Sequence, residues 1–425
     1  VTFVLIFVLR MPIPAGMIAA CTLYFLTDGL IKGVGFGALI TGAGGSLHLV
    51  AQKTIEAIFT NGTIVAVPLF IFAANVMNAG KITEYVFGTC MGLVGRFRGG
   101  LAHVNVLASL VFSGMTGSAI ADASGLGKLE IDAMRKEGYD DGFSCAITAA
   151  SATIGPIFPP SIPMVVYAML TGASVGALFM AGMVPGVLLA VALCVYVYFI
   201  AKKRNYPRTA PPKLRDYLLY LTKSIWAMLT PVILLVGIYT GIMTPTEAAA
   251  IAAFYGLIVG LFLYKEMDFK CLINSCIESC ETSAVIIVLM AMATLFGNIM
   301  TIEDVPGTVA RAILGLTENK FLILLLINIL LLFVGTFMEA LAAIVILTPI
   351  LLPVVTGVGV SPLHFGVIIV VNLAIGFITP PVGVNLFVAS GVASARIESI
   401  ARQCLPMLAL MLVVLLICMY IPSIP

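Results

Sequence analysis

Long apolar runs separated by short polar stretches make up most of this chain. Residues 321–334 and 407–421 are nearly free of charge, and many apolar runs approach the roughly 20 residues that an α-helix needs to cross a bilayer core. The runs are continuous rather than alternating, so they do not fit the strands of a transmembrane β-barrel. The pattern predicts an all-α polytopic membrane protein.

Two of the apolar runs are interrupted by glycine and proline. Residues 142–171 contain IGPIFPPSIP, which begins at Ile154, and residues 364–392 contain IGFITPPVGV, which begins at Ile375. Proline lacks a backbone N–H and disfavours helical geometry in the residue before it, whereas glycine permits backbone angles that other residues avoid. Each run is therefore predicted to be a discontinuous helix.

The two interruptions belong to an internal repeat. A shift of 221 residues superimposes IGPIFPP on IGFITPP with five of seven positions identical. Further positions that match in the same register are Phe112 with Phe333, Gly114 with Gly335, Ala119 with Ala340, Ala121 with Ala342, and Pro185 with Pro406. Several blocks in one register indicate duplication. Duplicated halves with an interrupted helix at corresponding positions are typical of secondary transporters.

The segment before each discontinuous helix has a polar centre and no charged loop there. Residues 104–126 contain SGMTGS at 113–118, and residues 326–355 contain GTFME at 335–339. Such segments fit re-entrant hairpins, which enter the membrane, turn at a polar tip and leave on the same side. Non-helical backbone at this depth is tolerated where protein or a water-filled cavity satisfies it.

Charge placement predicts that the two halves are inverted, because short basic loops face the cytoplasm. The connections around the first half are basic, and the linker 202–215 adds six lysines and arginines. The equivalent connection before the second half, residues 303–320, carries three acidic and two basic residues, so it is predicted to be external.

Composition limits the classes of function. Hydrophobic residues make up 61% of the chain and charged residues 10%, against about 25% charged in soluble domains. A net charge of +2 offers no basic surface for nucleic acid. The three histidines are isolated in the sequence, so they suggest neither a catalytic triad nor a histidine metal cluster. The sequence has no GxxxxGK[ST] motif, which a nucleotide-binding P-loop requires. Cys271, Cys276 and Cys280 lie near Glu278 and Glu281, but their spacing fits no common zinc pattern, so ordinary helix-face residues are favoured over a metal site. The chain is predicted not to be an enzyme and to hold no resident cofactor.

The interrupted helices supply the chemistry of a cation site. An unwound turn exposes backbone carbonyls, and Na⁺ is a hard cation that prefers oxygen ligands. Gly155 and Gly376 allow those carbonyls to point inward. Each half would then hold one Na⁺, and half-helix N-termini between them would attract an anion. Hydroxyl ligands are available from Ser113, Thr116, Ser118, Thr336 and Thr379. The alternative is that the prolines are simple kinks, which are common in membrane helices.

Three other polar residues of the repeats are candidates. Glu339 lies at the second hairpin tip, where a membrane charge suggests ion coordination, proton relay or a donor partner, with an ion pair or helix cap as the structural alternative. Asp122, just beyond the first hairpin tip, likewise has either a functional role or a structural one as a helix cap. Asn385 follows Pro381 by one helical turn, where it faces either substrate or a neighbouring helix.

Residues 244–247, TPTE, read as a helix start. Thr244 or Thr246 can cap the helix, Pro245 suits its first turn, and Glu247 favours its N-terminus. This interpretation requires no ligand.

Four motifs together resemble the large membrane subunit of the TRAP (tripartite ATP-independent periplasmic) transporters. They are GSAIADASGLG (117–127), GPIFPPS (155–161), GIMTPTEAAAIAAFYG (241–256) and ITPPVGVN (378–385). The resemblance covers essentially the whole chain and leans towards the sialic-acid branch. It implies an inverted-repeat elevator transporter with two re-entrant hairpins and two discontinuous helices, a multi-pass protein of the bacterial inner membrane.

The resemblance implies sodium-coupled import of an organic acid, with sialic acid the first candidate and a C4-dicarboxylate the second. It implies two or more Na⁺ as coupling ions. The implied partners are a small four-helix membrane subunit and a periplasmic substrate-binding protein. The domains follow as scaffold helices of repeat 1 (1–85), the first half of the transport domain (86–200), a cytoplasmic linker (201–223), scaffold helices of repeat 2 (224–305) and the second half of the transport domain (306–425).

The resemblance also implies the site residues, with Na⁺ between each hairpin tip and the neighbouring discontinuous helix. The residues expected to bind sodium are Ser113, Ser118, Gly155, Phe158, Pro160, Thr336, Gly376, Thr379 and Pro381. Those expected to contact the substrate are Thr116, Ser161, Glu339 and Asn385. Competing functions are an ion channel, a stand-alone dicarboxylate symporter, a tripartite tricarboxylate carrier and a membrane-embedded hydrolase.

Overall fold

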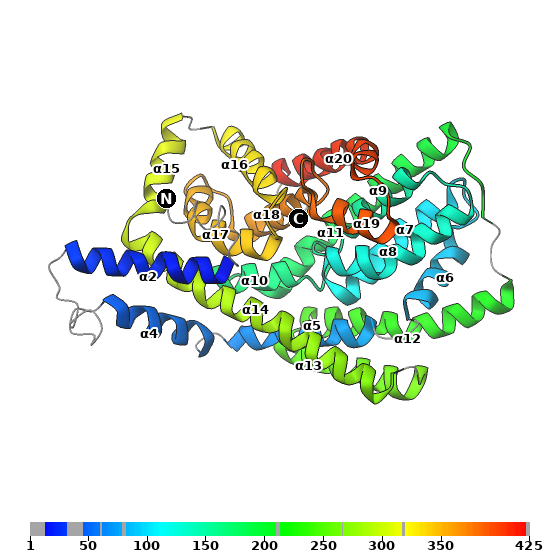
Figure 1. The fold of residues 1–425 in the computed structure, drawn as a ribbon, viewed down its shortest axis with the longest axis horizontal. Coiled ribbons are helices and arrows are strands. Elements are labelled where there is room, and N and C mark those ends of the chain that lie inside the picture. Colours follow the sequence, from blue (N-terminus) through cyan, green and yellow to red (C-terminus); the bar gives the residue numbers. More distant parts are fainter. Residues whose placement is uncertain are drawn as a thin grey trace.

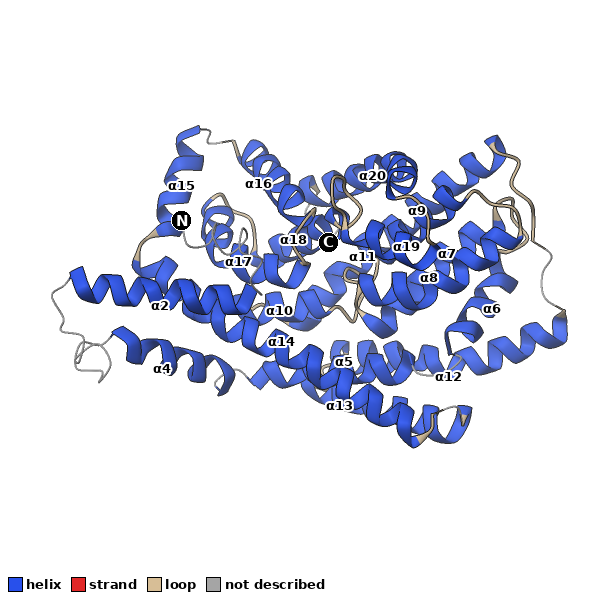
Figure 2. Ribbon diagram, viewed as in Figure 1, coloured by secondary structure: helices blue, strands red, loops and turns tan. Residues whose placement is uncertain are grey.

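The computed structural model describes residues 13–31, 46–59, 62–78, 82–209, 213–265, 267–316 and 319–421. Within these ranges every regular element is helical, as the apolar pattern predicts (Figure 2). The expected first scaffold segment, residues 1–85, lies only partly within them.

One group of helices runs along the lower side of the molecule in Figure 1, and the two repeats lie above it. Helix α14 packs on α2, α4 and α5, and α13 packs on α5 and α12. The lower group comprises α2 (Ile13–Ile31), α4 (Ser46–Phe59), α5 (Ala66–Asn78), α12 (Leu214–Tyr239), α13 (Pro245–Ile258) and α14 (Phe269–Ile302). Two short elements are the 3-10 turn η1 (Gly62–Val65), which precedes α5, and the π-helical turn η2 (Val259–Tyr264), which extends α13.

The first repeat contains a hairpin followed by a discontinuous helix, as predicted. Its elements are α6 (Ile82–Val94), the hairpin arms α7 (Gly100–Thr116) and α8 (Ala119–Lys136), the half-helices α9 (Asp141–Ala152) and α10 (Ile162–Thr171), and α11 (Val175–Lys203). The break between the half-helices covers Gly155, Pro156, Pro159 and Pro160 of the first interruption, whereas Pro163 lies in the first turn of α10.

The second repeat has the same order of elements. They are α15 (Val305–Leu316), the hairpin arms α16 (Lys320–Gly335) and α17 (Ala340–Gly357), the half-helices α18 (Pro362–Gly376) and α19 (Val384–Ala393), and α20 (Ile397–Tyr420). Adding 221 to the bounds of α8 gives those of α17, so the register found in the sequence is also the register of the helices.

A buried polar contact joins each hairpin to its own discontinuous helix. In the first repeat, the Ser151 hydroxyl of α9 donates to Asn105 Oδ1 of α7 at 2.7 Å. In the second, Asn372 Nδ2 of α18 donates to Asn328 Oδ1 of α16 at 2.5 Å. All four side chains are buried, and Asn372 is the 221-residue equivalent of Ser151. Because unpaired polar groups are costly in an apolar interior, these contacts fix how each hairpin lies on its partner.

Helix α13 begins with the cap expected at TPTE. Glu247 N donates to Thr244 Oγ1 at 3.3 Å, and Thr244 N donates to Glu247 Oε2 at 2.8 Å, which completes a capping box. The interpretation of TPTE as a helix start is confirmed.

Two expected domain boundaries fall inside helices. Helix α11 ends at Lys203 and α12 begins at Leu214, so residues 214–223 of the expected linker 201–223 are helical. The reason is that the basic stretch is followed by residues such as Tyr217 and Tyr220, which pack on the small residues Gly92 and Gly88 of α6. The boundary 85/86 likewise falls inside α6.

Six helices in the described ranges are long and apolar enough to cross a membrane, and the bent pair α5 and α6 would make a seventh span. Helices α7, α10, α16, α18 and α19 are apolar but shorter. Shorter apolar helices are what re-entrant hairpins and discontinuous spans require.

Candidate functional site

A cavity of about 610 Å³ lies between the lower helices and the two repeats. Helices α5 and α14 form one wall. The other wall combines both hairpin tips with residues of both breaks, including Thr116, Ser118 and Pro156 of the first repeat and Glu339 and Phe377 of the second. Residues of both predicted hairpin tips and of both predicted helix breaks therefore line one cavity.

The first hairpin turns at Gly117 and Ser118. Gly117 has φ of +61° and its N–H donates to Ser113 O at 3.1 Å, which ends α7. Ser118 caps α8, since Ala121 N donates to its hydroxyl at 3.4 Å. A Cβ added at Gly117 would lie 2.6 Å from Pro160 O, so the tip sits directly on the neighbouring break.

The first break lies against this tip. A Cβ added at Gly155 would come within 3.1 Å of Ser118 O. Ser161 caps α10: Met164 N donates to its hydroxyl at 3.2 Å, and the hydroxyl donates to Pro156 O. The peptide bond Pro159–Pro160 is cis.

The second repeat also has a contact between its hairpin tip and its break, although Gly376 meets Gly335 rather than Glu339, the equivalent of Ser118. A Cβ added at Gly376 would lie 2.6 Å from Gly335 C, and Gly383 N donates to Thr336 O at 2.9 Å. Glu339 caps α17, with Ala342 N donating to its Oε2 at 3.3 Å. The peptide bond Pro380–Pro381 is also cis.

Five residues predicted to bind sodium lie at these two contacts. They are Ser118, Gly155, Pro160, Thr336 and Gly376. The oxygen atoms nearest the contacts are main-chain carbonyls, which suit a hard cation.

The other four sodium candidates lie around the contacts. The Ser113 hydroxyl is buried and donates to Leu110 O at 2.6 Å. The Thr379 hydroxyl donates to Ile375 O at 3.0 Å. Phe158 packs against Gly186 of α11, and Pro381 is exposed.

The predicted substrate residues divide into two groups. Thr116 and Glu339 line the cavity. Ser161 uses its hydroxyl as a helix cap, and Asn385 is fully buried and donates from Nδ2 to Ala149 O at 3.1 Å. Asn385 therefore contacts a neighbouring helix, which is the alternative that the sequence left open for it.

Four polar residues of the lower wall were not predicted: Asn75 and Asn78 of α5, and Glu281 and Thr282 of α14. Asn75 Nδ2 donates to Ser279 Oγ at 2.8 Å, which ties the two wall helices together. Glu281 is exposed to the cavity from the interior of a 34-residue apolar helix. A carboxylate at such a position is the signal that could have identified it.

The matching protein family is described as the Tripartite ATP-independent periplasmic transporter, DctM component, and the match covers residues 1–424. The chain belongs to this family. It is a multi-pass protein of the bacterial inner membrane, of a class of permeases and not of enzymes.

The relatives of this DctM-family chain are named for different organic acids. It is 52% identical over 397 residues to the isethionate TRAP transporter permease protein DctMQ of Oleidesulfovibrio alaskensis, covering 92% of this chain and 62% of that protein. It is 43% identical over 377 residues to the sialic acid TRAP transporter large permease protein SiaM of Vibrio cholerae, covering 89% of this chain and 88% of that protein. It is 40% identical to the C4-dicarboxylate TRAP transporter large permease protein DctM of Pseudomonas aeruginosa, covering 85% of each.

A solved structure shares the fold. The YdaH transporter of Alcanivorax borkumensis superimposes with a TM-score of 0.66, covering 88% of each chain at 16% identity. At that identity the likeness concerns the fold alone.

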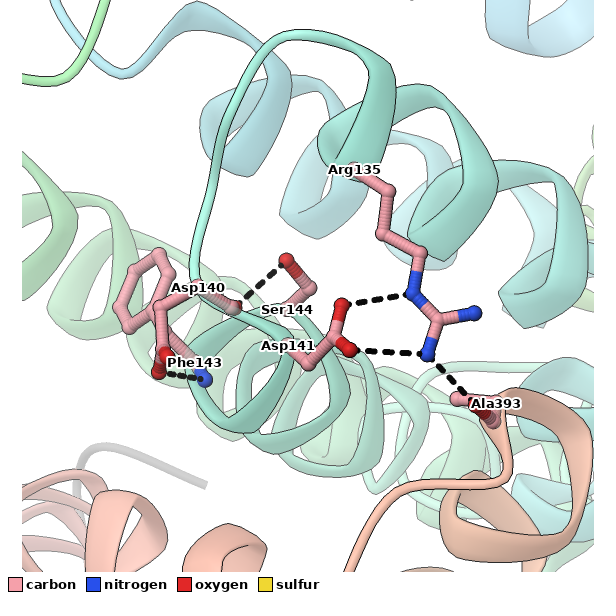
Figure 3. Close-up of polar contacts among 6 residues, drawn as sticks. All are labelled: Arg135, Asp140, Asp141, Phe143, Ser144 and Ala393. Carbon is pink, nitrogen blue, oxygen red and sulfur yellow. Dashed lines mark hydrogen bonds and ion pairs between the residues drawn. The ribbon is translucent and has the colours of Figure 1, made fainter.

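The DctM-family chain also links its two repeats at the end remote from the tips. Arg135 of α8 donates to Asp141 at 2.6 and 3.2 Å and to Ala393 O, at the end of α19, at 2.5 Å (Figure 3). Asp140 caps α9 beside them through Phe143 N at 3.1 Å. The hydrogen bond with Asp141 raises the pKa of the Arg135 guanidinium. The first hairpin is thereby fastened to the second discontinuous helix.

Proposed function

We propose that this chain is the large membrane subunit of a sodium-coupled TRAP transporter that imports an organic acid. One observation carries the proposal: each repeat has a contact between its hairpin tip and its broken helix, and residues of both tips and both breaks line a single cavity. Membership of the DctM family and the names of the relatives support a transporter permease.

Each contact is proposed to bind one Na⁺ between main-chain carbonyls of the tip and the break. A membrane potential of 100 mV is worth about 2.3 kcal/mol for each elementary charge moved. Entry of two Na⁺ with one monoanion moves one net positive charge inward, so the potential favours uptake.

The transport movement is proposed to be of the elevator type. The hairpins and discontinuous helices would move as one body against the wall formed by α5 and α14. The buried contacts within each repeat and the Arg135 link between repeats support a single rigid body. The proposed partners are a small four-helix membrane subunit and a periplasmic binding protein that delivers the substrate.

The test is uptake into proteoliposomes that contain the large and small subunits, with the binding protein outside. Sialic acid, isethionate and succinate are the substrates to compare, because the relatives named for sialic acid, isethionate and C4-dicarboxylates resemble this chain. We expect uptake of at least one acid with an inward Na⁺ gradient and none when choline replaces Na⁺. Uptake that is unchanged in choline contradicts sodium coupling, and a current without substrate favours a channel.

A further inference from the structure

The two hairpin tips differ in charge at the same position of the repeat. Ser118 and Glu339 are 221 residues apart, and each caps the second arm of its hairpin, α8 or α17. Both line the cavity. The first cap is a neutral hydroxyl and the second is a carboxylate, so the repeat is not symmetric in the chemistry that it offers a ligand.

The neutral side of the cavity favours an anion. The first residues of α8 and of α10, including Ala119 and Ile162, line the cavity, and their caps Ser118 and Ser161 carry no charge. Neither helix has an acidic cap. Helix α8 carries a buried acid, Asp122, in its first turn, which does not line the cavity, whereas α10 has no acid in its first turn, so the positive end of the α10 dipole is uncompensated. Thr116, which is 4% exposed, lines the cavity beside them.

The acidic side of the cavity favours hydrogen-bond donors. The Glu339 carboxylate already occupies the N-terminus of α17, which removes that helix as an anion site. Glu281 of α14 lines the same cavity from the opposite wall. An ionised carboxylate only accepts hydrogen bonds. Among the residues that the structure describes, the side chains that line the cavity include no lysine, arginine or histidine to compensate these two acids.

We propose that the cavity selects a monoanion that carries hydroxyl or ammonium donors away from its acidic group. The acidic group lies at the N-termini of α8 and α10, and the donors face Glu281 and Glu339. A dicarboxylate in the same position brings its second negative charge towards two carboxylates, which repel it. This inference rests on the proposed function, in which the cavity is the substrate site.

The inference is tested by direct binding to the detergent-solubilised complex of the large and small subunits in Na⁺, without the binding protein. The probes are isethionate and sialic acid, which are hydroxylated monoanions, and succinate. We expect succinate to bind about tenfold or more weakly than the better of the two monoanions. Equal or tighter binding of succinate overturns the inference and leaves sodium-coupled uptake intact. Absence of Na⁺-dependent uptake for all three acids overturns the proposed function and this inference with it.

Two variants test whether the preference for a monoanion over succinate comes from the carboxylates of Glu339 and Glu281. Glu339→Ser gives the second tip the cap of the first and retains helix capping, and Glu281→Gln leaves the fold of α14 unaffected. We expect each to weaken binding of the preferred monoanion about tenfold and to lower its preference over succinate. Glu398→Gln is the control, because Glu398 is an exposed acid in the first turn of α20 that does not line the cavity.

A purely structural role for Glu339 would lower the melting temperature of the complex and leave the ratio of affinities unchanged. If both Glu339→Ser and Glu281→Gln fold and keep the wild-type ratio of monoanion to succinate affinity, the two carboxylates do not set the selectivity and the inference is overturned.

Discussion

Gly155 and Gly376 lie at equivalent positions of the two breaks, and each meets the backbone of a hairpin tip. The atoms nearest an added Cβ are main-chain atoms of Ser118 and Ala152 at the first position and of Gly335 at the second. Backbone cannot rotate away as a flexible side chain can. The requirement for glycine therefore comes from the contact between two segments far apart in sequence.

Gly376→Ala is expected to separate the second tip from its break. Forcing a methyl into close packing costs about 1–3 kcal/mol, so the apparent affinity for Na⁺ should fall about tenfold. Sodium titration of uptake in proteoliposomes measures the change. Gly391→Ala is the matched control, because nothing lies within 4 Å of a Cβ at that position of α19.

Bulky side chains at the tips are expected to abolish sodium-dependent uptake while the protein still inserts. Ser118→Leu and Thr336→Leu place branched side chains at the two proposed Na⁺ sites. Ser124→Leu is the control, since Ser124 is exposed on α8. If both tip variants retain wild-type uptake, the paired-site interpretation is wrong.

At the scale of elements, each hairpin depends on a buried polar contact with its discontinuous helix. Asn372 donates to both the backbone O and the Oδ1 of Asn328, at 3.0 and 2.5 Å, in an otherwise apolar pair of helices. The two helices α16 and α18 have no other side chain–side chain hydrogen bond with each other among those found in the described residues. Their relative position is thus set by packing and this one contact.

Asn372→Leu is expected to destabilise the protein by about 1–3 kcal/mol, because Asn328 loses its donor in a buried position. Thermal unfolding of the purified complex measures the loss. The double variant Asn328→Leu/Asn372→Leu removes both polar groups, so it should recover part of the stability. A double variant whose loss equals the sum of the two single losses would show that the pair is not coupled.

At the scale of the molecule, the cavity lies where the wall of α5 and α14 meets the repeats. Helix α14 also packs on α17, and a Cβ at Gly297 would lie 3.7 Å from the Cβ of Pro349. This separation falls within the range of disulfide-linked residues, about 3.5–4.5 Å. The pair spans the boundary across which the proposed elevator movement takes place.

The variant Gly297→Cys/Pro349→Cys, in a background without the nine native cysteines, is expected to form a disulfide on oxidation. The link should stop Na⁺-dependent uptake, and a reducing agent should restore it, because the repeats can then no longer move along α14. Each single-cysteine variant, treated in the same way, is the control. Full uptake by completely cross-linked protein would exclude the elevator movement.

Local sequence predicted most of the helical pattern. Glycine and proline located both breaks, and the polar centres located both hairpin tips. The breaks follow from the missing N–H and the restricted geometry of proline, which act within a few residues. The helical structure of residues 214–223 was not predicted, because the first turns of α12 pack Tyr217 and Tyr220 against α6, which no local pattern records.

The sequence by itself determined the helical membrane class, the duplicated order of elements, and the hairpin residues that approach the cavity, because these depend on periodicity, composition and local backbone chemistry. Tertiary structure alone decided that Glu281 faces the same cavity as Glu339 and that Asn385 does not. Such assignments depend on which surfaces meet between segments far apart in sequence, and the energy of those contacts is distributed over packing that a linear pattern does not contain.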